Sequence, residues 1–184
     1  MKRFSVFLLV LILVVVSAVA YAYSGDLYNV PTFKFEHEPY GIGCGSCPVY
    51  SAPYQNAYRA ANGKASVDTT AYIDVGGFNE QGWLLVRYGT NNGSSRVGWI
   101  PPQYVRNVRT TMHPNFTRIR QTANGYINVA DNNLDPYDDS SRFYCLSPGE
   151  TYYVLGRYNY YNYDFLYIEF SYGSQVARGF IQTW

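Results

Sequence analysis

The sequence predicts an all-β protein, because its apolar residues occur in short runs separated by glycine, asparagine, proline and serine. Beyond the first apolar segment, no long stretch has helical periodicity. Tyrosine, which favours strands, occurs 21 times among 184 residues. The same order of strand-like segments recurs after about eighty residues, so the chain is predicted to contain two related β units.

The first apolar segment has the features of a secretory signal peptide. Lys2 and Arg3 precede a run from Val6 to Val16, and Ala20-Tyr21-Ala22 has the small-x-small pattern of a cleavage site. A membrane anchor is the alternative, but the run is shorter than the roughly 20 apolar residues of a spanning helix. We expect residues 1–22 to be removed, and the mature protein to be secreted, extracellular or associated with the cell wall.

The charge of the mature chain excludes two classes of partner. Loss of Lys2 and Arg3 reduces the 14 basic residues to 12, against 13 acidic residues. A net charge so close to zero gives neither a basic surface for nucleic acid nor an attraction to anionic membranes. We therefore expect neither nucleic acid nor a membrane as a partner after cleavage.

Four segments of the first unit recur in the second unit in the same order. The pairs are "PVYSAP" and "NVADNNLDP", "YIDVGGF" and "YVLGRY", "WLLVRY" and "FLYIEF", and "RVGWI" and "RGFI". Each unit of about sixty residues contains only short strands with one apolar face, which predicts a small closed or partly open barrel. Small barrels are marginally stable alone, so packing of the two units together would stabilise both.

Turns separate the predicted strands and set the boundaries of the units. "GTNNGSS" is typical of a hairpin turn, and "LSPGET" precedes the strand that begins at Tyr152. In the leader, "TFKFEHE" alternates apolar and polar residues, which indicates either an added strand of one barrel or a flexible segment. The predicted parts are a leader at 23–47, a first barrel at 48–106, a connector at 107–115 and a second barrel at 116–184.

The first unit resembles the bacterial SH3-like (SH3b) domain family. The segments "CPVYSAPYQNAYRAANGKASV", "GWLLVRYG" and "RVGWIPPQYV" carry the resemblance, and the region from Phe116 to Trp184 shares it more weakly. The resemblance implies two tandem small SH3-like β-barrels after a cleaved signal peptide. Modules of this family usually bind, often to cell-wall peptidoglycan or to an extended protein segment, so we expect a secreted binding protein rather than an enzyme.

The resemblance also places an aromatic groove in the first unit. In the SH3 pattern of eukaryotic signalling proteins, an early tyrosine, a tryptophan, a proline and a final tyrosine form one groove that accepts an extended ligand. Here the prolines of "GWIPPQYV" predict a strand end, a tight turn and a return at Tyr104. The expected ligand-binding residues are Tyr50, Tyr54, Trp83, Trp99, Pro101 and Tyr104.

Departures from the pattern modify this expectation. The loop that is acidic in eukaryotic grooves carries Arg59 and Lys64 here, so an acidic or neutral ligand fits at least as well as a basic proline-rich peptide. In the second unit, Phe165 replaces the groove tryptophan and Gln182 replaces the proline. We therefore expect one groove, in the first unit.

The most aromatic segment, from Arg157 to Phe170, is a second candidate surface. Its loop residues Tyr160, Tyr161 and Tyr163 would suit stacking on sugar rings. The alternative is a hairpin whose tyrosines simply cover the barrel.

Cys44 and Cys47 have the spacing of a dithiol redox motif, which makes a thiol-redox factor the alternative function. Such motifs lie at a helix N-terminus, whereas "PVYSAP" predicts strand and turn. A structural disulfide is normal in an exported domain. The pairing is open: Cys44 with Cys47, or either of them with Cys145.

Other chemistry has little support in the sequence. His37, His113 and the cysteines are scattered, unlike the four ligands of a zinc site, and neither histidine lies among segments that would form a catalytic cleft. The segment from Asp131 to Asp135 lacks the glycine and glutamate of a calcium loop. We expect no catalytic residue, metal or cofactor. A structural or adhesion role is a third possibility.

Overall fold

The computed structural model describes residues 27, 29–38, 45–68, 73–90, 95–106, 108–130, 142–160 and 162–183. The chain divides into two compact units, Met1–Val30 and Pro31–Trp184. The predicted signal peptide, Cys44, Tyr161 and the segment from Asp131 to Asp135 lie outside the described residues. Among the helices of the described part, none has the length and apolar character of a membrane span.

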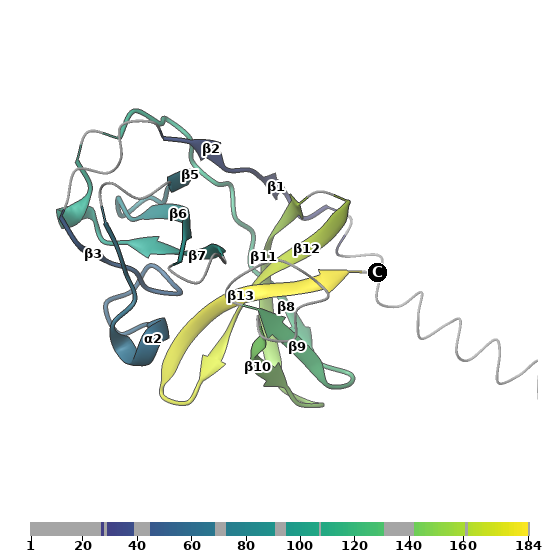
Figure 1. Cartoon of the computed structure of the whole chain (residues 1–184). Helices are drawn as coiled ribbons and strands as arrows, with labels where there is room; N and C mark the ends of the chain where they lie inside the picture. Colours follow the sequence, from purple (N-terminus) through teal and green to yellow (C-terminus); the bar gives the residue numbers. More distant parts are fainter. Residues whose placement is uncertain are drawn as a thin grey trace, which may run out of the picture. The chain divides into compact units, whose positions relative to one another are not determined.

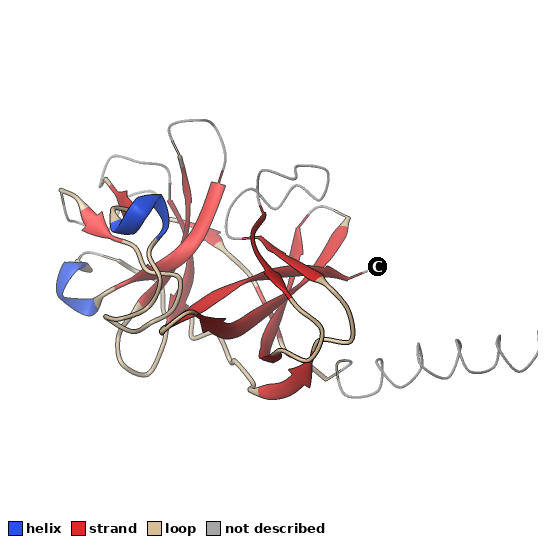
Figure 2. Cartoon of the chain, turned by 90° about the horizontal axis from the view of Figure 1, so that it is seen from below, coloured by secondary structure: helices blue, strands red, loops and turns tan. Residues whose placement is uncertain are grey.

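The described part of the chain is β-structure with two short helical turns, α2 (Ala60–Gly63) and the 3-10 turn η1 (Pro102–Tyr104), as Figures 1 and 2 show. This confirms the predicted all-β class. The strands are β1 (Thr32–Phe33), β2 (Glu36–His37), β3 (Cys47–Pro48), β4 (Ser66–Val67), β5 (Ile73–Phe78), β6 (Leu84–Gly89), β7 (Ser95–Ile100), β8 (Ile119–Thr122), β9 (Ile127–Ala130), β10 (Arg142–Leu146), β11 (Thr151–Tyr160), β12 (Tyr163–Tyr172) and β13 (Gln175–Thr183).

The strands form three sheets. One sheet has the order β2-β5-β6-β7, and a larger one has the order β1-β11-β12-β13-β9-β10, with β8 paired to β11. Strands β3 and β4 form the third sheet. Within the described residues, the pairing closes none of these sheets into a barrel, so the finer prediction of two SH3-like barrels stays a prediction.

The predicted repeat is visible in two equivalent antiparallel meanders, β5-β6-β7 and β11-β12-β13. The pairing of β5 with β6 shifts its register between Val75 and Gly77. The pairing of β11 with β12 shifts at the equivalent place, between Val154 and Gly156. Such a bulge bends a strand and increases its twist. The two repeats therefore share a local distortion as well as a strand order.

Each meander is crossed by a segment from the start of its own repeat. A Cβ atom on Gly98 would lie 2.4 Å from Val49 Cγ1, and one on Gly179 would lie 2.6 Å from Val129 Cγ1. Only glycine permits so close an approach. These crossings agree with the match of Val49 to Val129 at the start of "PVYSAP" and "NVADNNLDP", whereas the rest of the second segment lies outside the described residues.

The leader contributes strands to both large sheets. β1 pairs in parallel with β11, with Phe33 opposite Tyr158. β2 pairs antiparallel with β5, with Glu36 opposite Val75. This favours the strand alternative for "TFKFEHE", although the segment adds a two-residue strand to each of two sheets rather than one strand to one barrel.

One buried cluster contains residues of both large sheets. Leu85 and Trp99 are cross-strand neighbours in the first meander, and Tyr167 and Phe180 are cross-strand neighbours in the second. Each repeat thus covers apolar surface that the other would expose to water. The buried members of this shared core are Phe33, Trp83, Leu85, Trp99, Leu155, Tyr158, Phe165, Tyr167 and Phe180.

A second buried cluster belongs to the first repeat alone. It lies on the other face of β6, where Leu84 and Val86 point away from the shared core, as alternation along a strand requires. Its buried members are Cys47, Val49, Val67, Ile73, Val75, Leu84, Val86, Tyr88 and Ile100. Both faces of the first meander are consequently covered.

Candidate functional site

Three residues of the predicted groove reach the surface. Tyr54 is 40% exposed and Tyr104 is 37% exposed. Tyr50 is half-buried. These three side chains, which we call the tyrosine surface, remain the candidate contacts for a ligand.

The other three residues of the predicted groove are buried. Trp99 has no exposed surface, Trp83 is 7% exposed, and Pro101 is buried. Trp99 is therefore a core residue rather than a ligand contact in this structure. The predicted groove is not open at either tryptophan, because both rings belong to the shared core.

Tyr50 is held through both its backbone and its ring. Its N–H donates to Trp99 O at 2.9 Å, and its carbonyl accepts from the Trp99 N–H at 2.7 Å. The Trp83 ring meets the Tyr50 ring edge-to-face, with centroids 5.6 Å apart. The Arg59 guanidinium lies over the Tyr50 ring, 5.1 Å from its centroid. The two buried tryptophans thus support Tyr50, and Arg59 adds a positive charge beside it.

The segment "GWIPPQYV" ends β7 at Ile100 and continues into η1. The Tyr104 N–H donates to Pro101 O at 3.0 Å, which closes the turn. A Cβ atom on Gly82 would lie 3.3 Å from Pro102 Cβ, so the loop before Trp83 packs against this turn. The predicted strand end and turn are confirmed, with the difference that Tyr104 belongs to the turn.

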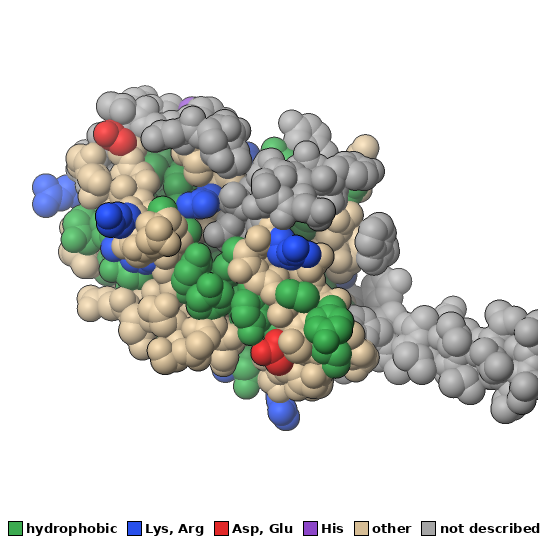
Figure 3. All heavy atoms as spheres, turned by 60° about the horizontal axis from the view of Figure 1, so that its bottom comes forward, with side chains coloured by type: hydrophobic (Ala, Val, Ile, Leu, Met, Phe, Trp, Pro, Cys, Tyr) green, Lys and Arg blue, Asp and Glu red, His purple; other side chains and the backbone are tan. Residues whose placement is uncertain are grey.

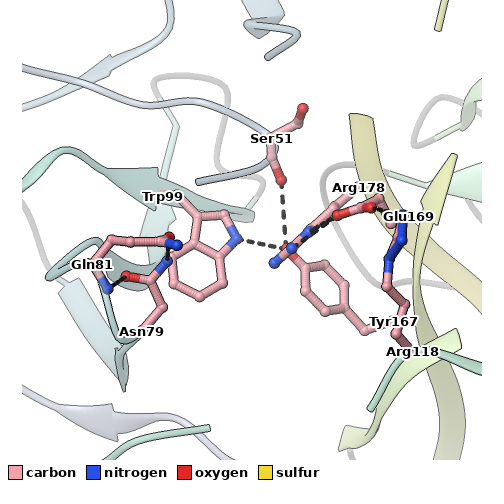
Figure 4. A network of polar contacts seen from close by, with 8 residues as sticks. All are labelled: Ser51, Asn79, Gln81, Trp99, Arg118, Tyr167, Glu169 and Arg178. Carbon is pink, nitrogen blue, oxygen red and sulfur yellow. Dashed lines mark hydrogen bonds and ion pairs between the residues drawn. The ribbon is translucent and has the colours of Figure 1, made fainter. Parts of the chain in front are cut away.

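Asn79 shapes the loop that leads to Trp83. Its side-chain oxygen accepts the Trp83 N–H at 2.8 Å, and its own N–H donates to Trp83 O at 3.0 Å. Its amide nitrogen donates to Gln81 Oε1 at 3.0 Å, as Figure 4 shows. These bonds fix the Trp83 backbone at the point where β6 begins.

Tyr54 lies beside a buried ionic network of the second repeat. The guanidinium carbon of Arg178 is 5.9 Å from the Tyr54 ring centroid and 5.4 Å from that of Trp99. Arg178 pairs with Glu169 at 2.8 Å, and Arg118 pairs with the same carboxylate at 2.9 Å, as Figure 4 shows. The Glu169 side chain is 6% exposed. Arg178 of the second repeat, whose charge is balanced by Glu169, therefore packs beside the exposed Tyr54 ring of the first repeat.

A buried hydrogen bond joins the two repeats next to this network. Trp99 Nε1 donates to Tyr167 Oη at 2.9 Å, and the Tyr167 hydroxyl donates to Ser51 O at 3.5 Å (Figure 4). Burial raises the pKa of Tyr167 to about 12, although the charge of Arg178 and the hydrogen bond from Trp99 oppose the shift. Tyr167 is therefore a protonated donor and acceptor inside the shared core.

This pKa predicts a loss of stability at high pH. Since an unfolded tyrosine releases its proton near pH 10 and folded Tyr167 keeps its proton to about pH 12, the free energy of unfolding should fall across that window. Tyr167→Phe lacks the titrating group. At pH 8 and at pH 11.5, the free energy of unfolding of the variant is compared with that of wild type. The difference between the two proteins should be about 2 kcal/mol smaller near pH 11.5 than near pH 8. Urea unfolding at both pH values measures this, and an unchanged difference would contradict it.

The predicted second surface packs mainly on the core. Tyr160 and Tyr163 are opposite each other at the end of the β11-β12 hairpin, and both are half-buried against the shared core. The Tyr160 ring is stacked 6.1 Å from that of Tyr158, with the Arg87 guanidinium 5.2 Å from its centroid. These contacts favour the alternative in which the hairpin tyrosines cover the fold.

The structure contains an aromatic cluster that sequence reasoning did not predict. The Tyr58 ring stacks on Phe143 with centroids 5.3 Å apart and lies 4.6 Å from the Tyr172 ring. The Tyr58 N–H donates to Val176 O at 3.0 Å. This cluster ties the loop after Tyr50 to the second repeat. No local signal reveals it, because its members lie far apart in the sequence.

The cysteines are separated in the fold. Cys145 is a free, half-buried thiol that donates to Leu146 O at 3.8 Å, so its pairing with Cys44 or Cys47 is excluded. Cys47 is fully buried and begins β3. The residues after it are strand and bends, not the helix of a dithiol redox motif. A Cys44–Cys47 disulfide stays a prediction.

The histidines and acidic residues show no common centre. His37 Nδ1 lies 3.6 Å from Asp74 Oδ1, whereas His113 Nδ1 lies 3.0 Å from Phe78 O. In the described residues, no group of three or more His, Cys, Asp or Glu side chains is arranged to hold a metal ion.

Comparison of the chain with models of protein families, with curated proteins and with solved structures finds no match. The resemblance to the bacterial SH3-like family therefore depends on the sequence motifs alone. The exposed tyrosines and the charges beside them are the features from which a function is inferred.

Proposed function

We propose that this chain is a secreted, non-catalytic binding protein of two SH3-like units, whose tyrosine surface binds cell-wall peptidoglycan. The observation that carries this proposal is the exposure of Tyr54 and Tyr104. In the described part of the chain, only three large hydrophobic side chains are exposed, and these two are among them. Both belong to the groove that the SH3 resemblance implies.

Side-chain and loop contacts connect the members of the tyrosine surface. Tyr50 contacts Trp83, and the loop before Trp83 packs on the turn that carries Tyr104. Tyr54 follows Tyr50 in the same loop and is supported by Arg178. Rings held by a buried core lose little freedom when a ligand binds, which lowers the entropic cost of binding.

The chemistry of the surface suits peptidoglycan. A tyrosine offers an apolar face for a sugar or peptide and a hydroxyl for hydrogen bonds. Figure 3 shows one face of the molecule, on which hydrophobic side chains gather with separate Lys and Arg side chains around them. Acidic side chains are few on this face. Peptidoglycan supplies sugar rings, extended peptides and carboxylates, all of which match these groups.

Retention of the mature protein on purified peptidoglycan tests the proposal. We expect the double variant with Tyr54→Ala and Tyr104→Ala to bind at least about tenfold more weakly than wild type, because it removes both exposed rings. Tyr126→Ala is the matched control, since Tyr126 is 79% exposed but lies outside the tyrosine surface. Trp83→Ala is unsuitable, because it would also disrupt the shared core.

Two results would contradict the proposed function. One is retention of wild type no greater than that of an unrelated secreted protein of similar charge. The other is equal retention of wild type and the double variant, with both proteins folded as judged by circular dichroism.

A further inference from the structure

Arg59 is fixed in place but lacks a counter-charge. Its Nη2 donates to Ala65 O at 2.7 Å, and its guanidinium lies over the Tyr50 ring. A guanidinium has five N–H donors. The Arg59 Nε is buried and has no hydrogen-bond partner, and no described carboxylate forms an ion pair with this side chain. Arg59 therefore keeps unused donors beside a residue of the tyrosine surface.

Ser51 supplies a second unused polar group next to Tyr50. Only three buried side-chain nitrogen or oxygen atoms of the described residues lack a partner, and two of them are Ser51 Oγ and Arg59 Nε. The Ser51 N–H donates to Tyr58 O at 2.8 Å, which holds Ser51 beside the residue that precedes Arg59. A buried polar group without a partner costs about 1–3 kcal/mol, so this loop holds two polar groups that the described residues leave unsatisfied.

The backbone that follows Arg59 is strained. Ala61 has φ 54° and ψ 46°, and Asn62 has φ 54° and ψ 44°. The left-handed conformation costs a residue such as alanine roughly 1–2 kcal/mol. Strain of this kind persists at ligand sites where the surrounding structure imposes it. Here it curls the chain back so that Ala65 accepts the Arg59 hydrogen bond.

Some arginines of the fold are paired with carboxylates of the protein, whereas Arg59 is not. Arg87, Arg157 and Arg178 each form an ion pair with a carboxylate of the protein. Arg59 instead shares its loop with the exposed Lys64. Arg59 therefore places a positive charge without a counter-charge beside Tyr50, and this charge attracts an anionic group of a ligand.

We infer that Arg59 binds a carboxylate of the ligand that packs on Tyr50. The planar fork of the guanidinium matches the two oxygens of a carboxylate. The ligand class is therefore an anionic peptide, such as the carboxylate-bearing peptide stems of peptidoglycan, rather than a neutral glycan. This inference rests on the proposed function and specifies its ligand.

Calorimetric titration with two soluble peptidoglycan fragments tests the inference. One fragment carries free carboxylates on its peptide stem, and the other is the same fragment with those carboxylates amidated. We expect wild type to bind the free form at least about tenfold more tightly, in keeping with a charge-assisted pair. Arg59→Gln should abolish this preference while affinity for the amidated fragment stays nearly constant.

Two further variants separate recognition from structure. Arg59→Lys keeps the positive charge but lacks the planar N–H donors of the guanidinium. It should therefore retain part of the preference for the fragment with free carboxylates. Arg120→Gln removes an exposed arginine of β8 and should leave the preference unchanged. Thermal unfolding of each variant shows whether the fold is intact.

The outcomes distinguish the inference from the proposed function. Equal binding of both fragments by wild type, or a preference that persists in folded Arg59→Gln, would overturn carboxylate recognition alone. Failure of wild type to bind either fragment would overturn both proposals.

Discussion

Glu169→Gln is expected to lower the free energy of unfolding by roughly 3–5 kcal/mol, because it leaves a buried arginine without its counter-charge. The Arg178 side chain is 9% exposed and Glu169 is 6% exposed, so water cannot replace the lost partner. Glutamine has nearly the same shape as glutamate. The loss therefore reports the charge rather than a cavity.

Urea unfolding monitored by circular dichroism measures this effect. Asp164→Asn is the matched control. The Asp164 side chain is 48% exposed, and its Oδ2 lies 3.4 Å from Arg157 Nη1. An exposed pair of this kind contributes little, so the control should change stability by less than about 1 kcal/mol. A change of similar size in both variants would show that the Glu169 network is not a buried ionic centre.

Trp99→Ala is expected to cost about 3–5 kcal/mol, because it removes a fully buried ring from the shared core. It also removes the donor that bonds Tyr167 Oη. Since residues of both repeats surround the ring, the whole of Pro31–Trp184 should lose stability together.

Differential scanning calorimetry checks the second part of this expectation. Wild type and Trp99→Ala should each unfold in a single cooperative transition, with the variant shifted to lower temperature. Tyr104→Ala is a suitable control, since its side chain lies outside the shared core and its removal should alter stability only slightly. Two transitions, of which only one shifts, would show that the repeats are independent domains.

Several features of the fold could be predicted because they depend on local chemistry. Short apolar runs between turn residues favour strands, and Pro101 and Pro102 cannot donate to a strand ladder, so β7 ends at Ile100. The repeat was detectable because equivalent strands keep similar residues in a similar order. Tyr54 and Tyr104 are exposed, as two of the predicted ligand contacts should be, while the groove itself stays a prediction.

Other features could not be predicted, because alternation along a strand does not reveal which face is covered. Trp99 and Gly98 point to opposite faces of β7. Val49 of the same repeat covers the Gly98 face, and the second repeat covers the Trp99 face. The sequence therefore suggested an aromatic groove at Trp99, whereas the packing of the repeats makes that ring part of the core.

Residue pattern alone is enough to establish a tyrosine-rich, all-β chain with an internal repeat, since strand preference and turn formation act over a few neighbouring residues. The arrangement of Arg178 beside Tyr54, and of Arg59 over Tyr50, emerges only in the folded chain. The first contact joins two repeats that are distant in sequence. The second depends on a turn in which Ala61 is strained, although Asn62 and Gly63 suit its left-handed backbone.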